Sequence, residues 1–341
     1  MLPMKNGLPS CAGSWQNWRD NMKIVYNGEM DPRLCRDVLG QTIQALAEKD
    51  DKVIYLDADL MSCIAMANWA KTHPQRAIQC GVGEANMIGV AAGLASAGFK
   101  PIAHTFGPFA SRRCYDQVFL SAGYAKNDIT VVGTDPGVTA TLNGGTHMPF
   151  EDVALYRAIP GSTIIDVSDA ASLPSILEQC VERPGVKYIR VGRKQMARIY
   201  EDGTRLPIGK AQVLRDGTDV TIFAAGIMLH EALKAAARLE QAGISAAVVD
   251  LYSIKPLDEQ TVLNYAKKTG AVVVAENHSH SGGVYDAVLQ VLAENHPVPA
   301  ETVSVKEQFG AVGSQDYLQK RFGLTAEKIE EAVRTVLARK G

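Results

Sequence analysis

Glu84 is a candidate residue for acid–base chemistry. It follows Gly81 and Gly83 and opens a stretch, residues 84–97, that carries no further charge. A carboxyl group there could simply favour a helix N-terminus, where the macrodipole attracts acids. The apolar helix behind it would also desolvate the group and favour its protonated form. Such a carboxyl group could exchange a proton with a ring nitrogen of a ligand, which is a catalytic property.

Two phenylalanines and a histidine follow in glycine-containing loops. Phe106 and Phe109 lie in the stretch TFGPF, outside any periodic element, and His147 lies in the stretch NGGTHMPFED. Rings three residues apart fill a core more often than they bind a ligand, and His147 could cap a helix beginning near Pro149. The glycines would let a ligand approach the backbone closely. Each stretch taken alone therefore allows a structural and a ligand-binding interpretation.

Short β-branched runs alternate with amphipathic or alanine-rich stretches along the chain. This pattern predicts an α/β protein whose mostly parallel sheets carry helices on both faces. Ligands of such sheets bind beyond the carboxyl ends of the strands. The helix over residues 84–97 is apolar on nearly all faces, so we expect it to be buried in a core or against another subunit. The predicted strands are residues 53–57, 129–133, 163–167, 188–191, 219–223, 245–250 and 271–275, and the predicted helices are residues 33–48, 84–97, 284–294, 327–338 and one ending near residue 242.

A segment containing Arg, Glu, Asp, Gly and Pro interrupts this rhythm and predicts a linker over residues 194–206. We therefore expect a first domain over residues 26–193 and a second over residues 207–341. Two domains agree with a chain of 341 residues, which is long for a single core. Residues 1–25 are polar at their start and lack an apolar signal-peptide core, so they are expected to be a disordered extension.

The composition is that of an ordinary soluble protein. The formal net charge is −2, with 46% hydrophobic and 21% charged residues, and the sequence has no long basic run and no apolar run of membrane-spanning length. Binding to nucleic acid or membranes is therefore not expected. The six cysteines form no C-x-x-C pair, which indicates neither a disulfide framework nor a zinc site. We expect a cytoplasmic protein.

The order and spacing of these stretches resemble the transketolase family over about nine tenths of the chain. Residues 33–192 resemble its pyrimidine-binding domain, through the G-x-x-E signature at residues 81–84, the segment TFGPF and the block GTHMPFEDVALYRAIPG. The remainder from residue 207 resembles its C-terminal domain, through TIFAAGIM, YSIKPLD and ENHSHSGG. The resemblance implies a transferase that moves a two-carbon ketol unit from a ketose phosphate, or a related acidic ketose, to an aldose.

The same resemblance implies thiamine diphosphate as the cofactor. Glu84 matches the residue that hydrogen-bonds the pyrimidine nitrogen N1′ and activates the coenzyme. Phe106 and Phe109 match the phenylalanines that pack around the pyrimidine ring, and Asp59 falls near the coenzyme at the subunit seam. The protein would mainly supply positioning, electrostatics and exclusion of water.

The resemblance also assigns substrate contacts. His147 matches a histidine that hydrogen-bonds a substrate oxygen. Arg193 and Arg33 match arginines that hold the acidic tail of a sugar phosphate, a role for which a planar bidentate donor suits better than lysine. Arg190 is the alternative to Arg193 if the register differs by a few residues.

Two positions depart from the usual transketolase pattern. Asn143 stands where an aspartate reads the stereochemistry of the donor, and Asp135 stands where a histidine contacts the substrate phosphate. An anion beside a phosphate would repel it. A locally shifted alignment or an acidic tail held elsewhere would also account for this difference. Our hypothesis is a substrate other than the common pentose phosphates, either another ketose phosphate or a sulfonated ketose.

The G-D-G…N motif that holds Mg²⁺ and the diphosphate in transketolases does not occur in this sequence. The resemblance therefore implies an N-terminal, diphosphate-binding partner subunit that carries Mg²⁺ or Ca²⁺, in an α2β2 heterotetramer. No metal-ligand set is predicted in the chain itself. His278 and His280 are expected to be solvent-facing turn residues, and His104 is expected to serve ordinary packing.

Three alternative functions remain open. The β subunit of a 2-oxoacid dehydrogenase shares the two-domain plan but typically carries an H-S-Q-x-x-E block where this chain has THMPFED. A deoxyxylulose-phosphate-synthase-like enzyme is favoured by Arg113 and the run YDQV, although that enzyme is one long chain. A catalytically silent partner or regulatory module is disfavoured because Glu84, both phenylalanines and His147 are retained.

Overall fold

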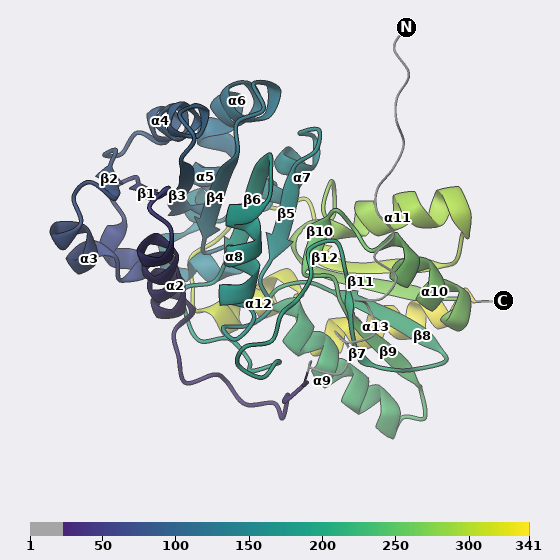
Figure 1. Cartoon of the computed structure of the whole chain (residues 1–341). Coiled ribbons are helices and arrows are strands. Elements are labelled where there is room, and N and C mark those ends of the chain that lie inside the picture. The colour runs from purple at the N-terminus through teal and green to yellow at the C-terminus, as the bar shows by residue number, and fades with distance from the viewer. Residues whose placement is uncertain (1–22, 341) are drawn as a thin grey trace, which may run out of the picture.

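The structure is a computed structural model and describes residues 23–340 of the chain (Figure 1). Most of the predicted N-terminal extension, residues 1–25, lies outside the described residues. Its last three residues differ from the prediction because they pair with residues 199–201. The backbone N–H of Val25 donates to the Ile199 carbonyl over 2.9 Å, and that of Glu201 donates to Lys23 over 3.0 Å.

Seven strands form the first sheet, in the order β10-β5-β6-β4-β3-β1-β2. Every neighbouring pair is parallel except β10 and β5, which are antiparallel. Every residue of β1, β4, β5 and β6 is buried, as expected for a sheet covered on both faces. The strands are β1 (Val53–Asp57), β2 (Ala77–Gln79), β3 (Lys100–Phe106), β4 (Ile129–Thr134), β5 (Thr163–Asp166), β6 (Val186–Val191) and β10 (Ser253–Lys255).

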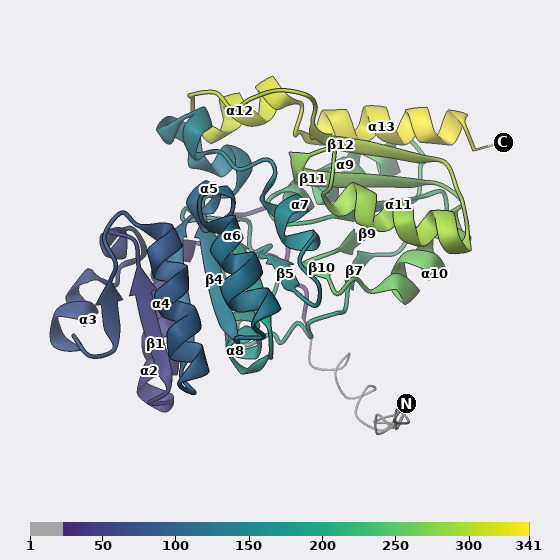
Figure 2. The ribbon, with the colours of Figure 1, turned by 90° about the horizontal axis from the view of Figure 1, so that it is seen from above.

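Helices cover both faces of this sheet (Figure 2). One face carries α2 (Cys35–Lys49) and α8 (Leu173–Glu182), and the other carries α4 (Glu84–Ser96) together with α6 (Tyr115–Gln117) and the π-helix η3 (Val118–Tyr124). The apolar helix predicted over residues 84–97 is confirmed as α4, which buries Met87, Ile88 and Ala91. Its opposite side, which includes Gly89 and Gly93, is exposed. The prediction of burial within this chain therefore holds for one face of α4.

The second sheet has five strands in the order β12-β11-β8-β9-β7. Its pairs are parallel except for β7 with β9. Helices α9 (Met228–Gln241) and α13 (Ala326–Ala338) lie on one face, and α10 (Glu259–Thr269) and α11 (Val284–Asn295) lie on the other. The strands are β7 (Gln212–Arg215), β8 (Val220–Ala224), β9 (Ala246–Asp250), β11 (Val272–Ser279) and β12 (Ala300–Val305).

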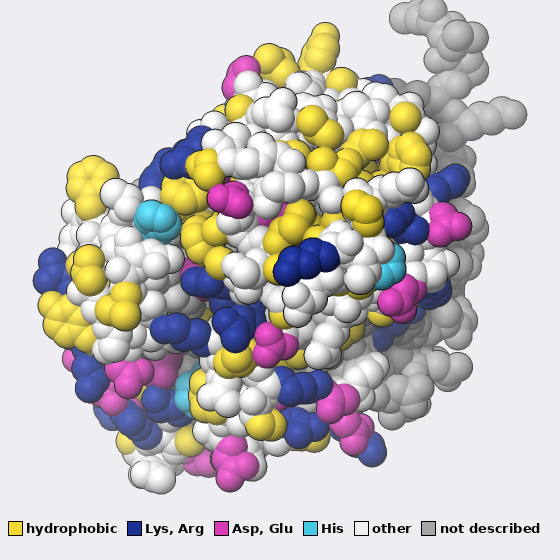
Figure 3. All heavy atoms as spheres, turned by 90° about the vertical axis from the view of Figure 1, so that its left-hand side faces the viewer, with side chains coloured by type: hydrophobic (Ala, Val, Ile, Leu, Met, Phe, Trp, Pro, Cys, Tyr) yellow, Lys and Arg dark blue, Asp and Glu magenta, His cyan; other side chains and the backbone are white. Residues whose placement is uncertain are grey.

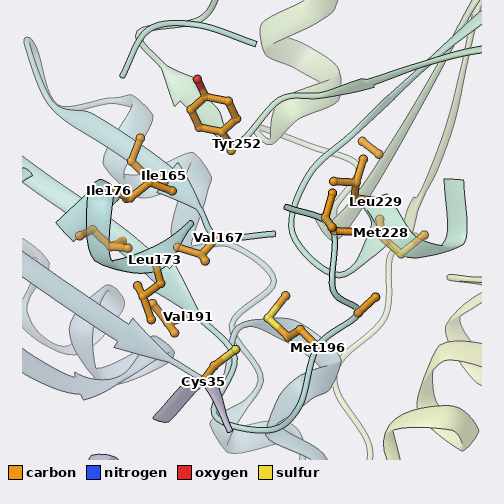
Figure 4. Packing of buried hydrophobic residues seen from close by; sticks show 14 of the residues in the cluster. Cys35, Ile165, Val167, Leu173, Ile176, Val191, Met196, Met228, Leu229 and Tyr252 are labelled. Carbon is orange, nitrogen blue, oxygen red and sulfur yellow. The ribbon is translucent and has the colours of Figure 1, made fainter. Parts of the chain in front are cut away.

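Two clusters of buried hydrophobic residues each include members of both sheets. Strand β10 follows β9 in the chain but pairs with β5 of the first sheet. Figure 4 shows Ile165 of β5, Val167 just after this strand and Leu173 of α8 on the side that faces Met228 and Leu229 of α9. The segment predicted as a linker, residues 194–206, runs between them as packed, largely extended chain, with side chains such as those of Met196, Ile199 and Tyr200 buried. Because both clusters extend across the two sheets, the two halves are expected to keep a fixed relative position.

Among the described residues, no helix is long and apolar enough to cross a membrane.

Candidate functional site

The carboxyl ends of the parallel strands bring the predicted site residues to one edge of the first sheet. Phe106 ends β3, Asp135 follows β4 directly, and Arg193 follows β6 after one glycine. Strands β3, β4 and β6 are neighbours in the sheet. Parallel neighbours end at the same edge, so residues that are far apart in the sequence meet there.

Phe106, Phe109 and His147 form an aromatic cluster at this edge. The His147 ring lies edge-on to both phenylalanines, with centroid distances of 5.0 Å to Phe109 and 5.9 Å to Phe106. Phe109 does not lie in a loop as predicted, because it belongs to a single helical turn, α5 (Gly107–Ala110). His147 ends the short 3-10 helix η5 (Gly145–His147), and the next helix begins only at Asp152. The histidine therefore does not cap that helix.

Gly107 allows this arrangement. A Cβ atom at position 107 would lie 2.6 Å from the Cγ of Pro149, which no real side chain could tolerate. The glycine lets the turn that carries Phe109 pack directly against the segment that follows His147. The two halves of the aromatic cluster can therefore come together.

Glu84 is the first residue of α4, and its side chain is buried, with 3% of its area exposed. Its carboxylate accepts hydrogen bonds from the Nη1 of Arg113 at 3.0 Å to Oε1 and 3.2 Å to Oε2. The guanidinium carbon of Arg113 lies 3.7 Å from the centroid of the Phe109 ring. Glu84 is thus tied to the aromatic cluster through an arginine that the sequence interpretation did not place there.

Arg193 forms the second cationic contact of the cluster. Its guanidinium carbon lies 4.8 Å from the centroid of the Phe106 ring, and its Nη2 lies 2.5 Å from the Oδ2 of Asp135. Burial opposes the charge of Arg193, but the hydrogen bond and the charge of Asp135 outweigh it and raise the pKa of Arg193. The thiol of Cys63 also raises the pKa of Arg193. Asp135 is buried, so it does not face the site as a free anion.

The other predicted contact residues lie at the periphery. Arg33 donates to Asp31 at 2.7 Å and to Asp202 at 2.6 Å. The hydrogen bond with Asp31 is the main reason why the pKa of Arg33 is raised and that of Asp31 is lowered. Asp59 and Asn143 have exposed side chains, in the turn after β1 and at the end of the 3-10 helix η4 (Gly137–Asn143). None of these three joins the contacts of the aromatic cluster.

Arg190 was wrongly predicted as an alternative substrate-binding arginine. Its side chain is 1% exposed. It donates to Asp152 Oδ2 at 2.8 Å, to Asp166 Oδ2 at 2.5 Å and to the Asn277 carbonyl at 2.9 Å. Burial opposes its charge, but the two carboxylates outweigh burial and raise the pKa of Arg190. Burial raises the pKa of Asp166, which Arg190 counters only in part. A guanidinium so fully engaged inside the protein cannot reach a substrate.

The prediction of a solvent-facing His278 is also wrong. His278 lies within β11 and is fully buried, and burial lowers its pKa to about 4. His280 is partly exposed. His104 is buried, with Nδ1 2.8 Å from Asp57 Oδ2, so the packing interpretation of His104 is confirmed. Within residues 23–340, no group of His, Cys, Asp and Glu could hold a metal ion.

Asn277 supports the site from the second sheet and was missed by the sequence interpretation. Its Oδ1 accepts from the Val138 backbone N–H at 3.0 Å, and its Nδ2 donates to the Pro136 carbonyl at 2.9 Å. Gly137 has a φ of +52°, and a Cβ there would clash with Asn277. The residue thus clamps the loop that leads from Asp135 to His147. Its position in the block ENHSHSGG was the available signal.

The arrangement can support proton exchange beside an aromatic surface. It combines a buried carboxylate, two rings, a histidine and two arginines at the carboxyl ends of parallel strands. Such convergence of a few polar groups with apolar walls is typical of ligand sites. Two family models match the chain, "Transketolase, pyrimidine binding domain" over residues 32–198 and "Transketolase, C-terminal domain" over residues 209–329. The chain belongs to the transketolase family.

Relatives of similar length are components of split transketolases. The chain is 47% identical over 319 residues to the 6-deoxy-6-sulfo-D-fructose transketolase subunit SqwH of Clostridium sp. (strain MSTE9), covering 94% of this chain and 99% of that protein. It is 32% identical to one subunit of the apulose-4-phosphate transketolase of Phocaeicola vulgatus, covering 86% of this chain and 95% of that subunit. A solved structure described as "Split gene transketolase, inactive beta4 tetramer" superposes with a TM-score of 0.84 at 37% identity. The match covers 90% of this chain and 99% of that chain. The chain is accordingly a transketolase-type transferase subunit.

Proposed function

We propose that this chain binds the aminopyrimidine half of thiamine diphosphate, with Glu84 at the ring nitrogen and Phe106 and Phe109 beside the ring. The observation that carries the proposal is the buried carboxylate of Glu84, which lies next to an aromatic cluster at the carboxyl edge of the sheet. Membership of a thiamine-diphosphate-dependent family supports it. The donor set fits the group, because an aminopyrimidine needs an apolar surface and an acceptor at its ring nitrogen.

The residues of this chain would serve positioning and proton exchange. When bound, the coenzyme supplies a nucleophilic carbon and an electron sink. Glu84 would hold a proton at the pyrimidine nitrogen, and Phe109 would exclude water from that hydrogen bond. His147 would hydrogen-bond a substrate oxygen, since its ring stands edge-on to both phenylalanines and it is only partly buried.

We further propose that the donor is an acidic ketose whose tail carries a single negative charge, a sulfonated ketose. The name of the relative at 47% identity supports this substrate class. The ion pair of Arg193 with Asp135 supports it independently, because the pair has no net charge. A phosphate ester carries about −1.5 to −2 near neutral pH, whereas a sulfonate carries one charge. The dianion would meet more repulsion from Asp135 than the monoanion would. Arg33 and Asn143 would lie at the edge of the substrate site.

A second subunit would supply the diphosphate site with its Mg²⁺ or Ca²⁺, in an α2β2 assembly in the cytoplasm. The subunit names of the relatives support the need for a partner. Large apolar side chains are exposed beside the site, including Leu142, Val312 and Phe309, the last of which is 98% exposed. Figure 3 views the side that carries α4, and hydrophobic side chains are spread over its upper part, whereas charged ones gather below. The free cysteines of the described residues suit a reducing compartment.

We also propose the domain division at residues 26–193 and 207–341, with Asp59 facing the seam between subunits. The two separate sheets and the residues matched by the two family models support this division. The exposed position of Asp59, two residues after β1, supports its assignment to the seam.

Reconstitution tests the proposed function. The chain is mixed with the diphosphate-binding subunit from the same genome, thiamine diphosphate and Mg²⁺, and coenzyme binding is followed by titration calorimetry. Transfer of a two-carbon unit from 6-deoxy-6-sulfofructose to an aldose acceptor is followed by mass spectrometry. We expect binding and transfer in the mixture, and neither with either subunit alone. Transfer that is faster from xylulose 5-phosphate would contradict the substrate class, and absence of coenzyme binding by the mixture would contradict the function.

A further inference from the structure

We propose that Arg113 is a positioning residue for Glu84, which it fixes against the ring of Phe109 so that the remaining face of the carboxylate meets the ligand. The inference rests on the proposed coenzyme-binding function and adds a residue to it. Two independent contacts carry it, one polar and one aromatic.

The two residues that form the polar contact differ in how deeply they are buried. Glu84 is 3% exposed, whereas the side chain of Arg113 is 45% exposed. The hydrogen bonds of the Glu84 carboxylate within the described residues both come from one nitrogen, the Nη1 of Arg113. A carboxylate offers about four lone-pair positions, so this bifurcated contact leaves acceptor positions on both oxygens. The pair can therefore hold the carboxylate in place without consuming its capacity to bind a ligand.

The aromatic contact fixes the arginine itself. Its guanidinium carbon lies 3.7 Å above the Phe109 ring, within the distance of a favourable cation–π interaction. Phe109 in turn contacts His147, with ring centroids 5.0 Å apart. Arg113 thus connects the carboxylate on α4 with the aromatic cluster after β3.

The neighbouring arginine provides a contrast. Arg112 is exposed to the same extent but points elsewhere, donating to Glu151 Oε1 at 2.7 Å and to the Thr146 carbonyl at 2.9 Å. Both arginines belong to one 3-10 turn, η2 (Arg112–Cys114). Substitution of Arg112 therefore removes the same charge from the same turn without touching Glu84 or Phe109.

Lysine cannot reproduce both contacts. An ammonium group can pair with Glu84, but it lacks the planar surface that lies over Phe109. The Arg113→Lys variant should therefore restore part of what Arg113→Ala loses. This graded response separates positioning from a general effect of charge.

The test uses the full chain reconstituted with the diphosphate-binding subunit. Thiamine diphosphate binding is measured by titration calorimetry, and the bound coenzyme is observed by near-ultraviolet circular dichroism, which responds to the state of the pyrimidine ring. We expect Arg113→Ala to weaken coenzyme binding about 10- to 100-fold, as loss of a hydrogen bond to a charged group predicts. The dichroic signal should also change. The coenzyme affinity of Arg113→Lys should lie between those of Arg113→Ala and the unsubstituted complex. Arg112→Ala should bind the coenzyme within about twofold of the unsubstituted complex.

The outcomes separate this inference from the proposed function. Coenzyme binding by the unsubstituted complex, together with an Arg113→Ala variant that binds equally well and gives the same dichroic signal, overturns the positioning role alone. Failure of the unsubstituted complex to bind overturns the proposed function as well. Because Arg113 is half exposed, we expect its variants to fold. Arg113→Gln gives the same readout in case the alanine variant does not fold.

Discussion

Arg193, which is partly exposed, forms an ion pair with the buried Asp135, with 2.5 Å between Nη2 and Oδ2, at the carboxyl ends of two adjacent strands. The same guanidinium covers the Phe106 ring. The aspartate thus neutralises the arginine that the resemblance assigns to the substrate tail. Under the proposed function, this ion pair would let Asp135 influence the choice between singly and doubly charged substrates.

The Asp135→Asn variant should shift that choice toward phosphates. Asparagine can keep a hydrogen bond to Arg193 but frees its positive charge, which attracts a dianion more strongly than a monoanion. We expect the ratio of kcat/KM for a ketose phosphate to that for the sulfonated ketose to rise about tenfold. Steady-state kinetics of the reconstituted complex measures it. The Glu259→Gln variant, which removes an exposed charge on α10, should leave the ratio unchanged, and an unchanged ratio in Asp135→Asn would refute the charge argument.

Glu84→Ala should abolish turnover and leave the fold intact. Loss of a positioned proton-exchange group lowers a rate by about 10²- to 10⁴-fold. The stability should change little, because the partner left behind, Arg113, is half exposed to water. Sugar transfer and thermal unfolding are measured on the same preparation. A variant that keeps more than a tenth of the rate would show that Glu84 is not the proton-exchange group.

Arg190→Met should destabilise the fold. It should leave the substrate selectivity unchanged. The substitution leaves Asp152 and Asp166 as buried carboxylates without their cation. Breaking one partner of a buried ion pair costs about 3–5 kcal/mol. Urea unfolding measures the loss, with Arg238→Met as the control, because Arg238 pairs with Glu327 and Glu330 at the surface, where ion pairs contribute little to stability. A loss as small as that of the control would mean that the buried network contributes little.

The sequence was sufficient to predict those strands and helices whose hydrophobic residues recur with a clear period. The strand predicted over residues 53–57 coincides with β1, and the helix predicted over residues 84–97 differs from α4 by one residue. Both depend on local hydrophobic pattern, which a sequence carries directly. The grouping of Phe106, Phe109 and His147 was likewise accessible, since the loops after parallel strands meet at one edge.

What the sequence could not supply was the partner of each charged side chain. Arg190 and Arg193 lie three residues apart on and after one strand, yet one is buried between two carboxylates and the other borders the site. His278 was misjudged because the continuation of β11 past residue 275 depends on contacts between residues far apart in the sequence, such as the hydrogen bond from the Ser279 N–H to the Phe150 carbonyl. Arg113 was noted only as a family marker. Its contact with Glu84 joins residues 29 positions apart and exists only in the folded chain.

Asp250 should make the stability of the protein fall as the pH rises toward neutrality. It ends β9 and is fully buried, accepting from the Ser168 hydroxyl at 2.8 Å and the Tyr200 hydroxyl at 2.7 Å. Burial raises its pKa from 3.8 to about 7, although both hydrogen bonds oppose this shift. Between those two pH values the folded state keeps a proton that the unfolded state has released. The free energy of unfolding contributed by this group therefore decreases with rising pH across that window.

Asp250→Asn should remove this contribution, because asparagine does not titrate and can still bond to both hydroxyls. Urea unfolding of the two proteins is compared from pH 5 to pH 7, which cancels the effect of every other titrating group. We expect the unsubstituted protein to lose stability relative to the variant by about 1 kcal/mol per pH unit. Parallel pH dependences would mean that Asp250 is already ionised in the folded chain, and that its two hydroxyl donors outweigh burial.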